Sequence, residues 1–220
     1  MKVYHKVLAS AALVICMALG MTGCGSEPVD GSQVVATVGE KEMPLGEANF
    51  LLRFQQVQTE SFYESMLGEG IYVKDVSGTG STFGEDFKSN IMKEMQEYYV
   101  IEEKAADYGA ALTEEETAEI TEAAKAFVEA NKADTLEQMT ADQATVERVL
   151  SLMKLRSKVE AAVKAEVDVA ETAEEAEKET ARTEYFNEVL AGWTAEYPFT
   201  VVDSVWEQVV FDRSYEVKAE

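Results

Sequence analysis

The side chains with the most reactive chemistry lie near the start of this 220-residue chain. His5 is its only histidine, and Cys16 and Cys24 are its only cysteines. Histidine and cysteine supply many of the general bases, nucleophiles and zinc ligands of proteins, so their positions decide which reactions are open to the chain. The 42 Asp and Glu residues are spread along the sequence, and no spacing among them singles out a catalytic pair.

The residues around Cys24 have the pattern of a bacterial lipoprotein signal peptide. Lys2 and Lys6 give a positively charged start, and residues 7–19 are almost wholly apolar. This apolar run has the length of a signal-peptide core and is shorter than the roughly 20 residues that span a bilayer. Residues 21–24, Met-Thr-Gly-Cys, then resemble a lipobox with Met in place of the usual Leu. In such proteins the cysteine receives a diacylglycerol and becomes the first residue.

Cleavage before Cys24 would leave a mature chain with one cysteine and no histidine. That chain could form no internal disulfide, Ser-His-Asp or Cys-His catalytic site, or Cys/His zinc site. We therefore expect no catalytic residue, no metal and no cofactor, with a carboxylate-only site as the remaining catalytic option. A lipid on Cys24 would hold the protein on the extracytoplasmic face of the cell membrane. An ordinary secretory signal and an uncleaved N-terminal helix are the alternatives.

The composition indicates a folded, strongly acidic protein. The net charge is −23, whereas 46% of the residues are hydrophobic. Contacts to phosphates need clustered Lys and Arg, so we expect no nucleic-acid partner. The same charge disfavours adhesion to an anionic membrane, so the lipid anchor must supply the membrane contact.

Composition also divides the chain. We assign a signal peptide (1–23), a tether (24–33), a helical domain (34–166), an acidic segment (167–183) and a closing helix and strand (184–220). The tether is rich in Gly and Ser, and as a flexible coil it would reach roughly 15–18 Å. The acidic segment has few apolar residues, which is typical of a solvated helix or a mobile linker.

Two short strand-like segments and a turn between them predict a short β-hairpin at the start of the helical domain. Residues 34–38 and 41–43 would pair through a turn at Gly39-Glu40, where Gly tolerates a positive φ. Residues 68–82 are rich in Gly, Ser and Thr and predict a long loop, with an extended piece at 71–73.

Apolar spacing and capping signals predict a chain of helices. Thr82 with Glu85, and Thr113 with Glu116, have the spacing of capping boxes, and Thr140 to Gln143 is a third capping signature. The helices are expected at 44–67, 83–108, 114–131, 143–164 and 185–196, with β-prone residues at 199–202 and 206–211. The fold class is therefore mainly α with a small β element.

The order of these elements resembles the N-terminal chaperone domain of the SurA/PrsA/trigger-factor-like foldases. The passage from Thr82-Phe83-Gly84-Glu85 through Ala105 to Gly109 and Leu112 to Glu116 carries the likeness, which covers most of residues 34–211. The hairpin departs from the family, because Gly39-Glu40 stands where Asn-Gly is usual. In full-length relatives a parvulin-type prolyl isomerase domain lies where this chain has only residues 167–183, and parvulin sites use histidines.

The resemblance implies a chaperone scaffold without its isomerase. We expect a membrane-anchored, extracytoplasmic lipoprotein that binds unfolded or secreted polypeptides without catalysis. The candidate client-binding side chains are aromatic: Phe50, Phe54, Phe62, Tyr63, Tyr98 and Tyr99. Aromatic stripes at helical spacing form cores more often than binding surfaces. The alternatives are a surface or assembly lipoprotein with one specific partner, and a chain classed as a peptidyl-prolyl isomerase by homology only. The sequence leaves the oligomeric state open.

Overall fold

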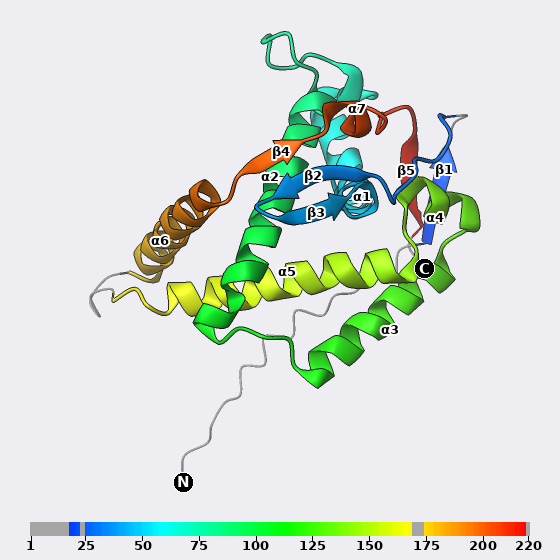
Figure 1. Ribbon diagram of the computed structural model, residues 1–220. Helices are drawn as coiled ribbons and strands as arrows, with labels where there is room; N and C mark the ends of the chain where they lie inside the picture. The colour runs from blue at the N-terminus through cyan, green and yellow to red at the C-terminus, as the bar shows by residue number, and fades with distance from the viewer. Residues whose placement is uncertain (1–17, 23–24, 169–173, 219–220) are drawn as a thin grey trace.

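The computed structural model describes residues 18–22, 25–168 and 174–218. It confirms a mainly helical fold with a small three-stranded antiparallel sheet (Figure 1). The long helices α1, α2 and α5 cross at the centre, α3 packs along α5, and α6 lies against α2 and α5. The helices are α1 (Leu45–Leu67), α2 (Phe83–Lys104), α3 (Glu114–Ala130), α4 (Ala133–Met139), α5 (Gln143–Lys164), α6 (Glu175–Glu196) and α7 (Asp203–Trp206).

The sheet contains the predicted hairpin and one strand from the end of the chain. Strands β2 (Val34–Val38) and β3 (Lys41–Pro44) pair through the expected turn, in which Gly39 has a φ of 59°. Strand β4 (Phe199–Val201) pairs antiparallel with the other edge of β2. The sheet order is therefore β3-β2-β4, and a return from the distant C-terminal region completes it.

Two predicted capping boxes are confirmed and fix the starts of α2 and α3. The Thr82 backbone N–H donates to Glu85 Oε2 at 2.6 Å, and the Glu85 N–H donates to Thr82 Oγ1 at 3.2 Å. Thr113 and Glu116 form the same reciprocal pair. Helix α2 gives way to a 3-10 helix, η2 (Ala105–Tyr108), which ends at the predicted position and is followed by Gly109 with a φ of 60°.

The third capping signature is shifted. Asp142, not Thr140, caps α5, because its carboxylate accepts the backbone N–H of Thr145 at 2.9 Å. Thr140 instead ends α4 in the left-handed conformation, with a φ of 51°. Its hydroxyl donates to the carbonyl oxygen of Gly46 at 2.8 Å, and this bond links the end of α4 to the start of α1.

Helix α6 begins about ten residues earlier than predicted, and it takes up part of the acidic segment 167–183. A capping box between Glu174 and Glu177 starts it, and its first turns are exposed. Ala and Glu have high helix propensity, so these turns form without a buried face. The packed part begins at Phe186 and continues through Leu190 and Trp193. Residues 169–173 of the acidic segment lie outside the described residues.

Two predicted extended segments are wrong. Residues 71–73 form a 3-10 helix, η1 (Ile71–Val73), because a turn buries Ile71 and Tyr72 together while Val73 stays exposed. Residues 206–211 form no strand with β2, because β4 already occupies that edge. Val209 is instead buried in the hydrophobic core, and Phe211 stacks on Tyr72.

The predicted tether lies along the body of the protein over its described part, residues 25–33. Ser26 donates its N–H to Asp212, and its carbonyl oxygen accepts a bond from Arg213 Nη2 at 2.5 Å. Farther along, backbone bonds from the start of α1 reach this segment, including Leu45 N–H to the Gln33 oxygen at 2.7 Å. A freely swinging tether is therefore wrong for residues 25–33, whereas Cys24 lies outside the described residues.

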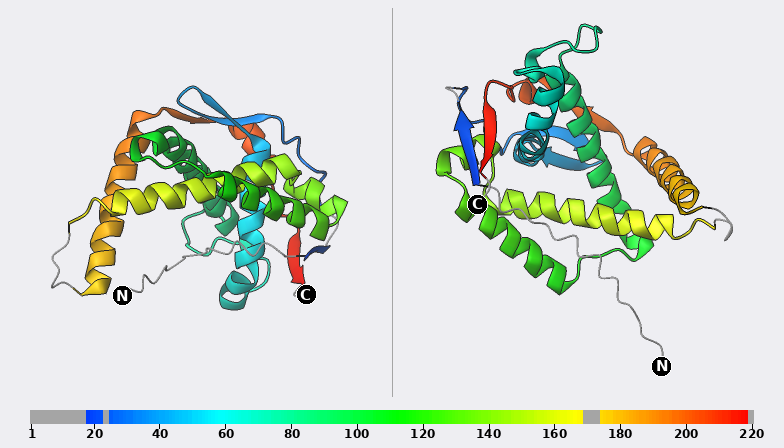
Figure 2. Two further views of the ribbon diagram at one scale, coloured as in Figure 1. Left: turned by 90° about the horizontal axis from the view of Figure 1, so that it is seen from below. Right: turned by 180° about the vertical axis from the view of Figure 1, so that it is seen from behind.

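A second, two-stranded sheet lies at the end of the molecule opposite α6 (Figures 1 and 2). Strand β1 (Ala18–Thr22) pairs antiparallel with β5 (Ser214–Lys218). Strand β1 falls within residues 1–23, the range that the sequence assigns to a signal peptide. No helix in the described part of the chain is long and apolar enough to cross a membrane.

Candidate functional site

Four of the six candidate client-binding aromatics are buried in the core. Phe50 and Phe54 pack against Phe127, with ring centroids 5.6 Å and 6.5 Å from it. Tyr98 and Tyr99 are buried on α2. These four side chains pack between the helices and are each at most 7% exposed, so the expectation that they face a client is corrected by their burial.

Phe62 and Tyr63 remain at the surface, near the end of α1. Phe62 is 60% exposed, and Tyr63 packs its ring against Phe83 at 4.8 Å. Further exposed apolar side chains follow in the last turn of α1 and in the next loop. We call this set the apolar tip: Phe62, Met66, Leu67, Val73 and Val76. The end of α1 and this loop project from the body (Figure 2).

A charged cluster inside the helical body is already satisfied by its own members. Tyr99 Oη donates to Glu47 Oε2 at 3.0 Å, and Arg148 Nη2 donates to Glu102 Oε2 at 3.0 Å. Burial raises the pKa of Glu47, and the positive charge of Arg148 partly offsets this. The cluster links α1, α2 and α5, and neither of the two cavities described below is lined by these four residues.

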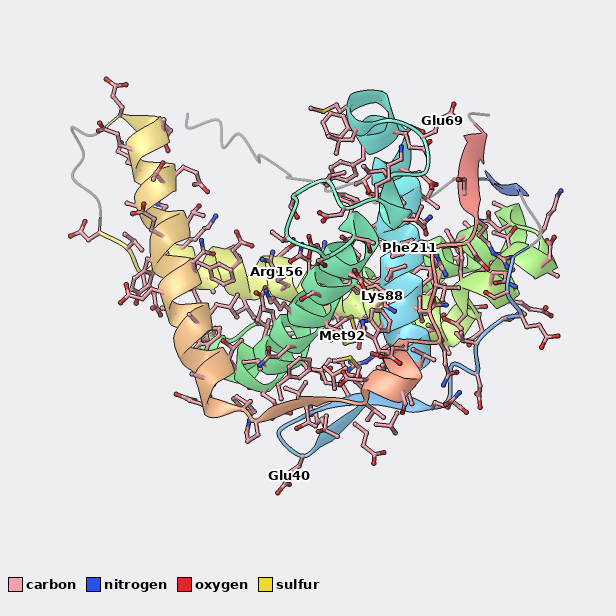
Figure 3. The ribbon with its side chains drawn as sticks, turned by 90° about the horizontal axis from the view of Figure 1, so that it is seen from above. Glu40, Glu69, Lys88, Met92, Arg156 and Phe211 are labelled. Carbon is pink, nitrogen blue, oxygen red and sulfur yellow. The ribbon has the colours of Figure 1, made fainter. Side chains whose placement is uncertain are left out.

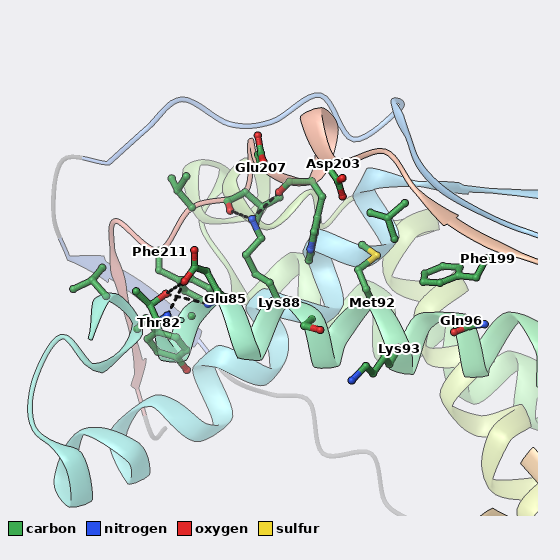
Figure 4. Close-up of a pocket in the computed structure, with 18 residues that line it drawn as sticks. Thr82, Glu85, Lys88, Met92, Lys93, Gln96, Phe199, Asp203, Glu207 and Phe211 are labelled. Carbon is green, nitrogen blue, oxygen red and sulfur yellow. Dashed lines mark hydrogen bonds between the residues drawn. The ribbon is translucent and has the colours of Figure 1, made fainter. Parts of the chain in front are cut away.

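An apolar groove of about 740 Å³ lies between α2 and the chain from β4 to Phe211. Figure 4 shows α2 along one side and the C-terminal segment along the other. Its lining exposes mainly apolar atoms. The apolar side chains are Met92 from α2 and Phe199, Val201, Trp206, Val209, Val210 and Phe211 from the C-terminal segment. Val73 of the apolar tip also lines it, so groove and tip are continuous.

Lys88 joins the two walls of the groove. Its Nζ donates to the carbonyl oxygens of Trp206 and Val209, each at 2.7 Å, and lies 4.9 Å from the centre of the Trp206 ring (Figure 4). Burial lowers the pKa of Lys88 to about 8, and the positive charge of Arg53 acts in the same direction. The ammonium group therefore holds the last turn of α7 onto α2.

An aromatic stack closes one end of the groove. The Phe211 ring lies 4.4 Å from the Tyr72 ring at an interplanar angle of 10°, and Phe87 lies edge-on to both. Gly84 permits this approach, because a Cβ there would lie 2.5 Å from the Tyr72 carbonyl oxygen and 2.7 Å from Phe211 Cδ2. Figure 3 shows Lys88, Met92 and Phe211 in one region between α2 and the C-terminal segment.

Two side chains of α1 also bind the backbone of this C-terminal segment. Arg53 Nη2 donates to the Val210 carbonyl oxygen at 2.7 Å, and Gln56 Nε2 donates to that of Arg213 at 3.2 Å. Both side chains are buried. Together with Lys88 they fix backbone carbonyls of an irregular segment, which has few hydrogen bonds of its own. The part of the groove wall that follows α7 is thus held by side chains of α1 and α2, whereas β4 and α7 are regular secondary structure.

A second cavity of about 710 Å³ lies between residues 31–32 and the α4–α5 junction. Its lining includes Thr140 and Asp142, whose side chains already bond to the backbone. In the loop after α1, the Asp75 carboxylate likewise accepts the N–H groups of Gly78 and Gly80. Both sets of polar groups are explained by local structure.

The groove combines an apolar lining with a few ionisable side chains. Its ionisable lining residues are Tyr72, Glu85, Lys88, Lys93, Asp203 and Glu207, with no His or Cys. Among the described residues, no three His, Cys, Asp or Glu side chains gather as a metal site. An apolar groove with a few polar groups is the usual form of a ligand site. Comparisons with protein-family models, curated proteins and solved structures found no match to this chain.

Sequence reasoning missed the groove because its far wall comes from another part of the chain. One signal was present on α2, where Gly84, Lys88 and Met92 recur every four residues and therefore share a face. This face lies beside a stripe of apolar residues that also recur every four positions, at Phe83, Phe87, Ile91 and Met95. A glycine and a lysine on one helical stripe do not by themselves distinguish a groove from a solvated surface.

Proposed function

We propose that this protein is a membrane-anchored, extracytoplasmic lipoprotein that holds unfolded or secreted polypeptides and releases them without catalysis. The resemblance to the N-terminal chaperone domain of the SurA/PrsA/trigger-factor-like foldases supports this function. The lipobox around Cys24 supports the anchor. In this proposal the chain keeps the chaperone scaffold and has no isomerase domain.

The observation that carries the proposal is the groove and its continuity with the apolar tip. Its volume of about 740 Å³ falls within the range of sites that hold several apolar groups. Val73 and Val210 line it and are 66% and 40% exposed, so apolar surface extends from the groove to solvent. Exposed contiguous apolar surface on a soluble body commonly marks a binding site.

The charge of the protein fits such a role. A net charge of −23 keeps copies of the protein apart, although each exposes apolar side chains. It also favours clients that carry Lys and Arg next to apolar segments. Salt should therefore weaken capture of basic clients more than capture of neutral ones.

The test is suppression of aggregation by the processed protein in phosphatidylcholine vesicles. A chemically denatured reference protein is diluted into the vesicles, and light scattering is followed with empty vesicles as the blank. Val73→Asp with Val210→Asp should lose most of the suppression, because charges would replace apolar groove side chains. Tyr185→Asp on α6 is the matched control, since Tyr185 is 36% exposed and lies outside the groove lining.

No suppression by the wild-type protein at several-fold molar excess would contradict the proposal. Capture of one stoichiometric partner from the parent membrane would favour the alternative of a specific assembly lipoprotein. The anchor has its own test, because Cys24→Ala should abolish incorporation of an alkyne-labelled palmitate. Labelling that persists in this variant would refute attachment at Cys24.

A further inference from the structure

Strand β5 is bound along one edge by a segment that the proposed processing removes. Its five residues pair antiparallel with β1, including Leu19 with Val217 and Met21 with Tyr215. Within the described residues, β1 is the only strand paired with β5. Both strands lie side by side in all three ribbon views (Figures 1 and 2). Cleavage before Cys24 would therefore take away the one strand that covers this edge.

The chain on the other side of the cleavage position is held in place independently of β1. Ser26 is bound by Asp212 and by Arg213, and its carbonyl oxygen also accepts a bond from Gln138 Nε2 at 3.3 Å. The backbone just before β5 is held as well, because Gln56 donates to the Arg213 carbonyl oxygen. Loss of residues 1–23 would thus leave one edge of β5 unpaired, while the segments next to it stay bound to the body of the protein.

An open strand edge presents unpaired N–H and C=O groups, which pair readily with an extended chain. The segment seated there indicates the chemistry of the occupant. β1 has the sequence Ala-Leu-Gly-Met-Thr, which carries no charge, and it runs antiparallel to β5. In a protein with a net charge of −23, an uncharged segment avoids the repulsion that an acidic one would meet.

We propose that β5 of the processed protein is a docking strand that binds an extended, uncharged segment of a client polypeptide in antiparallel pairing. The chain's own residues 18–22 occupy this site before processing and keep it closed. This inference rests on the proposed removal of residues 1–23, and it adds a backbone-pairing site to the apolar groove. Main-chain hydrogen bonds supply its affinity, so it accepts many sequences.

The test measures binding of a fluorescent peptide that contains Ala-Leu-Gly-Met-Thr between flanking Gly and Lys residues. Fluorescence anisotropy compares the processed wild-type protein with Cys24→Ala, in which intact mass should show that residues 1–23 remain. We expect the wild type to bind the peptide at least tenfold more tightly than Cys24→Ala. A peptide with alternate N-methylated residues has the same side chains and lacks pairing N–H groups, so it should not bind.

A second variant tests the strand itself. Val217→Pro removes a backbone N–H from β5 and should weaken peptide binding at least tenfold, whereas Val217→Thr keeps that N–H and should bind like the wild type. Thermal unfolding of both variants reports whether the fold is intact. If Val217→Pro does not fold, binding of the ordinary and the N-methylated peptides to the wild-type protein still tests whether the peptide pairs through its backbone.

Equal binding of the ordinary and N-methylated peptides would overturn the docking strand. So would binding by Cys24→Ala that matches the wild type. If the wild-type protein is a dimer and Val217→Pro is a monomer, the occupant of the β5 edge is a second copy of the chain and not a client. Intact residues 1–23 in the membrane protein would overturn both the processing and this inference, whereas aggregation suppression without peptide binding would overturn this inference alone.

Discussion

Replacing Lys88 with methionine should loosen the C-terminal wall of the groove. Methionine keeps the unbranched apolar stem and removes the ammonium group, which donates to the carbonyl oxygens of Trp206 and Val209. A hydrogen bond to a charged group contributes about 1.5–3 kcal/mol, and the cost rises when carbonyls are left without a donor. Lys88 is partly exposed, so water replaces some of these bonds. We expect Lys88→Met to lower the free energy of unfolding by about 1–3 kcal/mol at pH 7.

The pH dependence of this difference follows from the lowered pKa of Lys88. Its folded value of about 8 lies below the ordinary value of 10.5, so between these limits the folded protein binds fewer protons than the unfolded chain. The contribution of Lys88 to the free energy of unfolding therefore rises as the pH increases from about 8 to 10.5, and it is constant below about pH 8. For a fully buried group the rise would be about 3 kcal/mol, and partial exposure reduces it to about 1–2 kcal/mol.

The assay is urea denaturation of the wild type and of Lys88→Met at pH 7, 8, 9 and 10. Hydrogen exchange of residues 203–213 would show whether the wall opens locally before the body unfolds. Lys93→Met is the matched control, because Lys93 is an exposed lysine of the same helix that also lines the groove. A Lys88→Met variant as stable as the wild type, or a stability difference that does not grow above pH 8, would refute the reasoning.

Two further predictions concern α2 and α3. Gly84→Ala should destabilise the protein by about 2–4 kcal/mol by overpacking, since the new Cβ would meet Phe211 and a backbone oxygen that cannot move aside. Gly192→Ala is the control, because open space surrounds the position of its new Cβ, and it should stabilise the protein by up to about 1 kcal/mol. Thermal unfolding of both variants measures the two effects, and equal effects would contradict the packing at Gly84. A hydrogen bond from Lys158 lowers the pKa of Glu116 to about 2, so its contribution is present above the ordinary value of 4.5 and is lost as the pH falls toward 2. Glu116→Gln should therefore cost under about 1 kcal/mol at pH 7 and much less at pH 2, as measured by denaturation at both pH values. A loss that does not depend on pH would argue against the ion pair.

The parts of the fold that the sequence predicted are those with local causes. The capping boxes at Thr82 and Thr113 need only residues three positions apart, and both form as expected. The hairpin turn depends on the positive φ that Gly39 tolerates. The helix ends at Gly109 and Leu67 also follow from local glycine signals, since Gly68 follows Leu67.

The features that the sequence did not predict depend on partners far along the chain. The β-prone residues 206–211 failed to form a strand because β4 occupies the free edge of β2. The polar segment 25–33 has the composition of a tether, yet Asp212 and Arg213 hold it in place. Aromatic spacing on a helix does not reveal which side other helices cover, and Phe50 and Phe62 on the same helix differ from fully buried to 60% exposed.

The docking of residues 25–33 also constrains the order in which the protein can fold. Ser26 and Arg213, which are bonded to each other, are 187 positions apart in the sequence. A chain is synthesised from its N-terminus, so the contact of Ser26 cannot form until the 187 residues that follow it have been synthesised. In the same way, the second edge of β2 stays unpaired until Val201 has been synthesised, and the far wall of the groove is incomplete until Phe211 has been synthesised. The helical body can assemble first, and the groove is completed only when the last residues arrive.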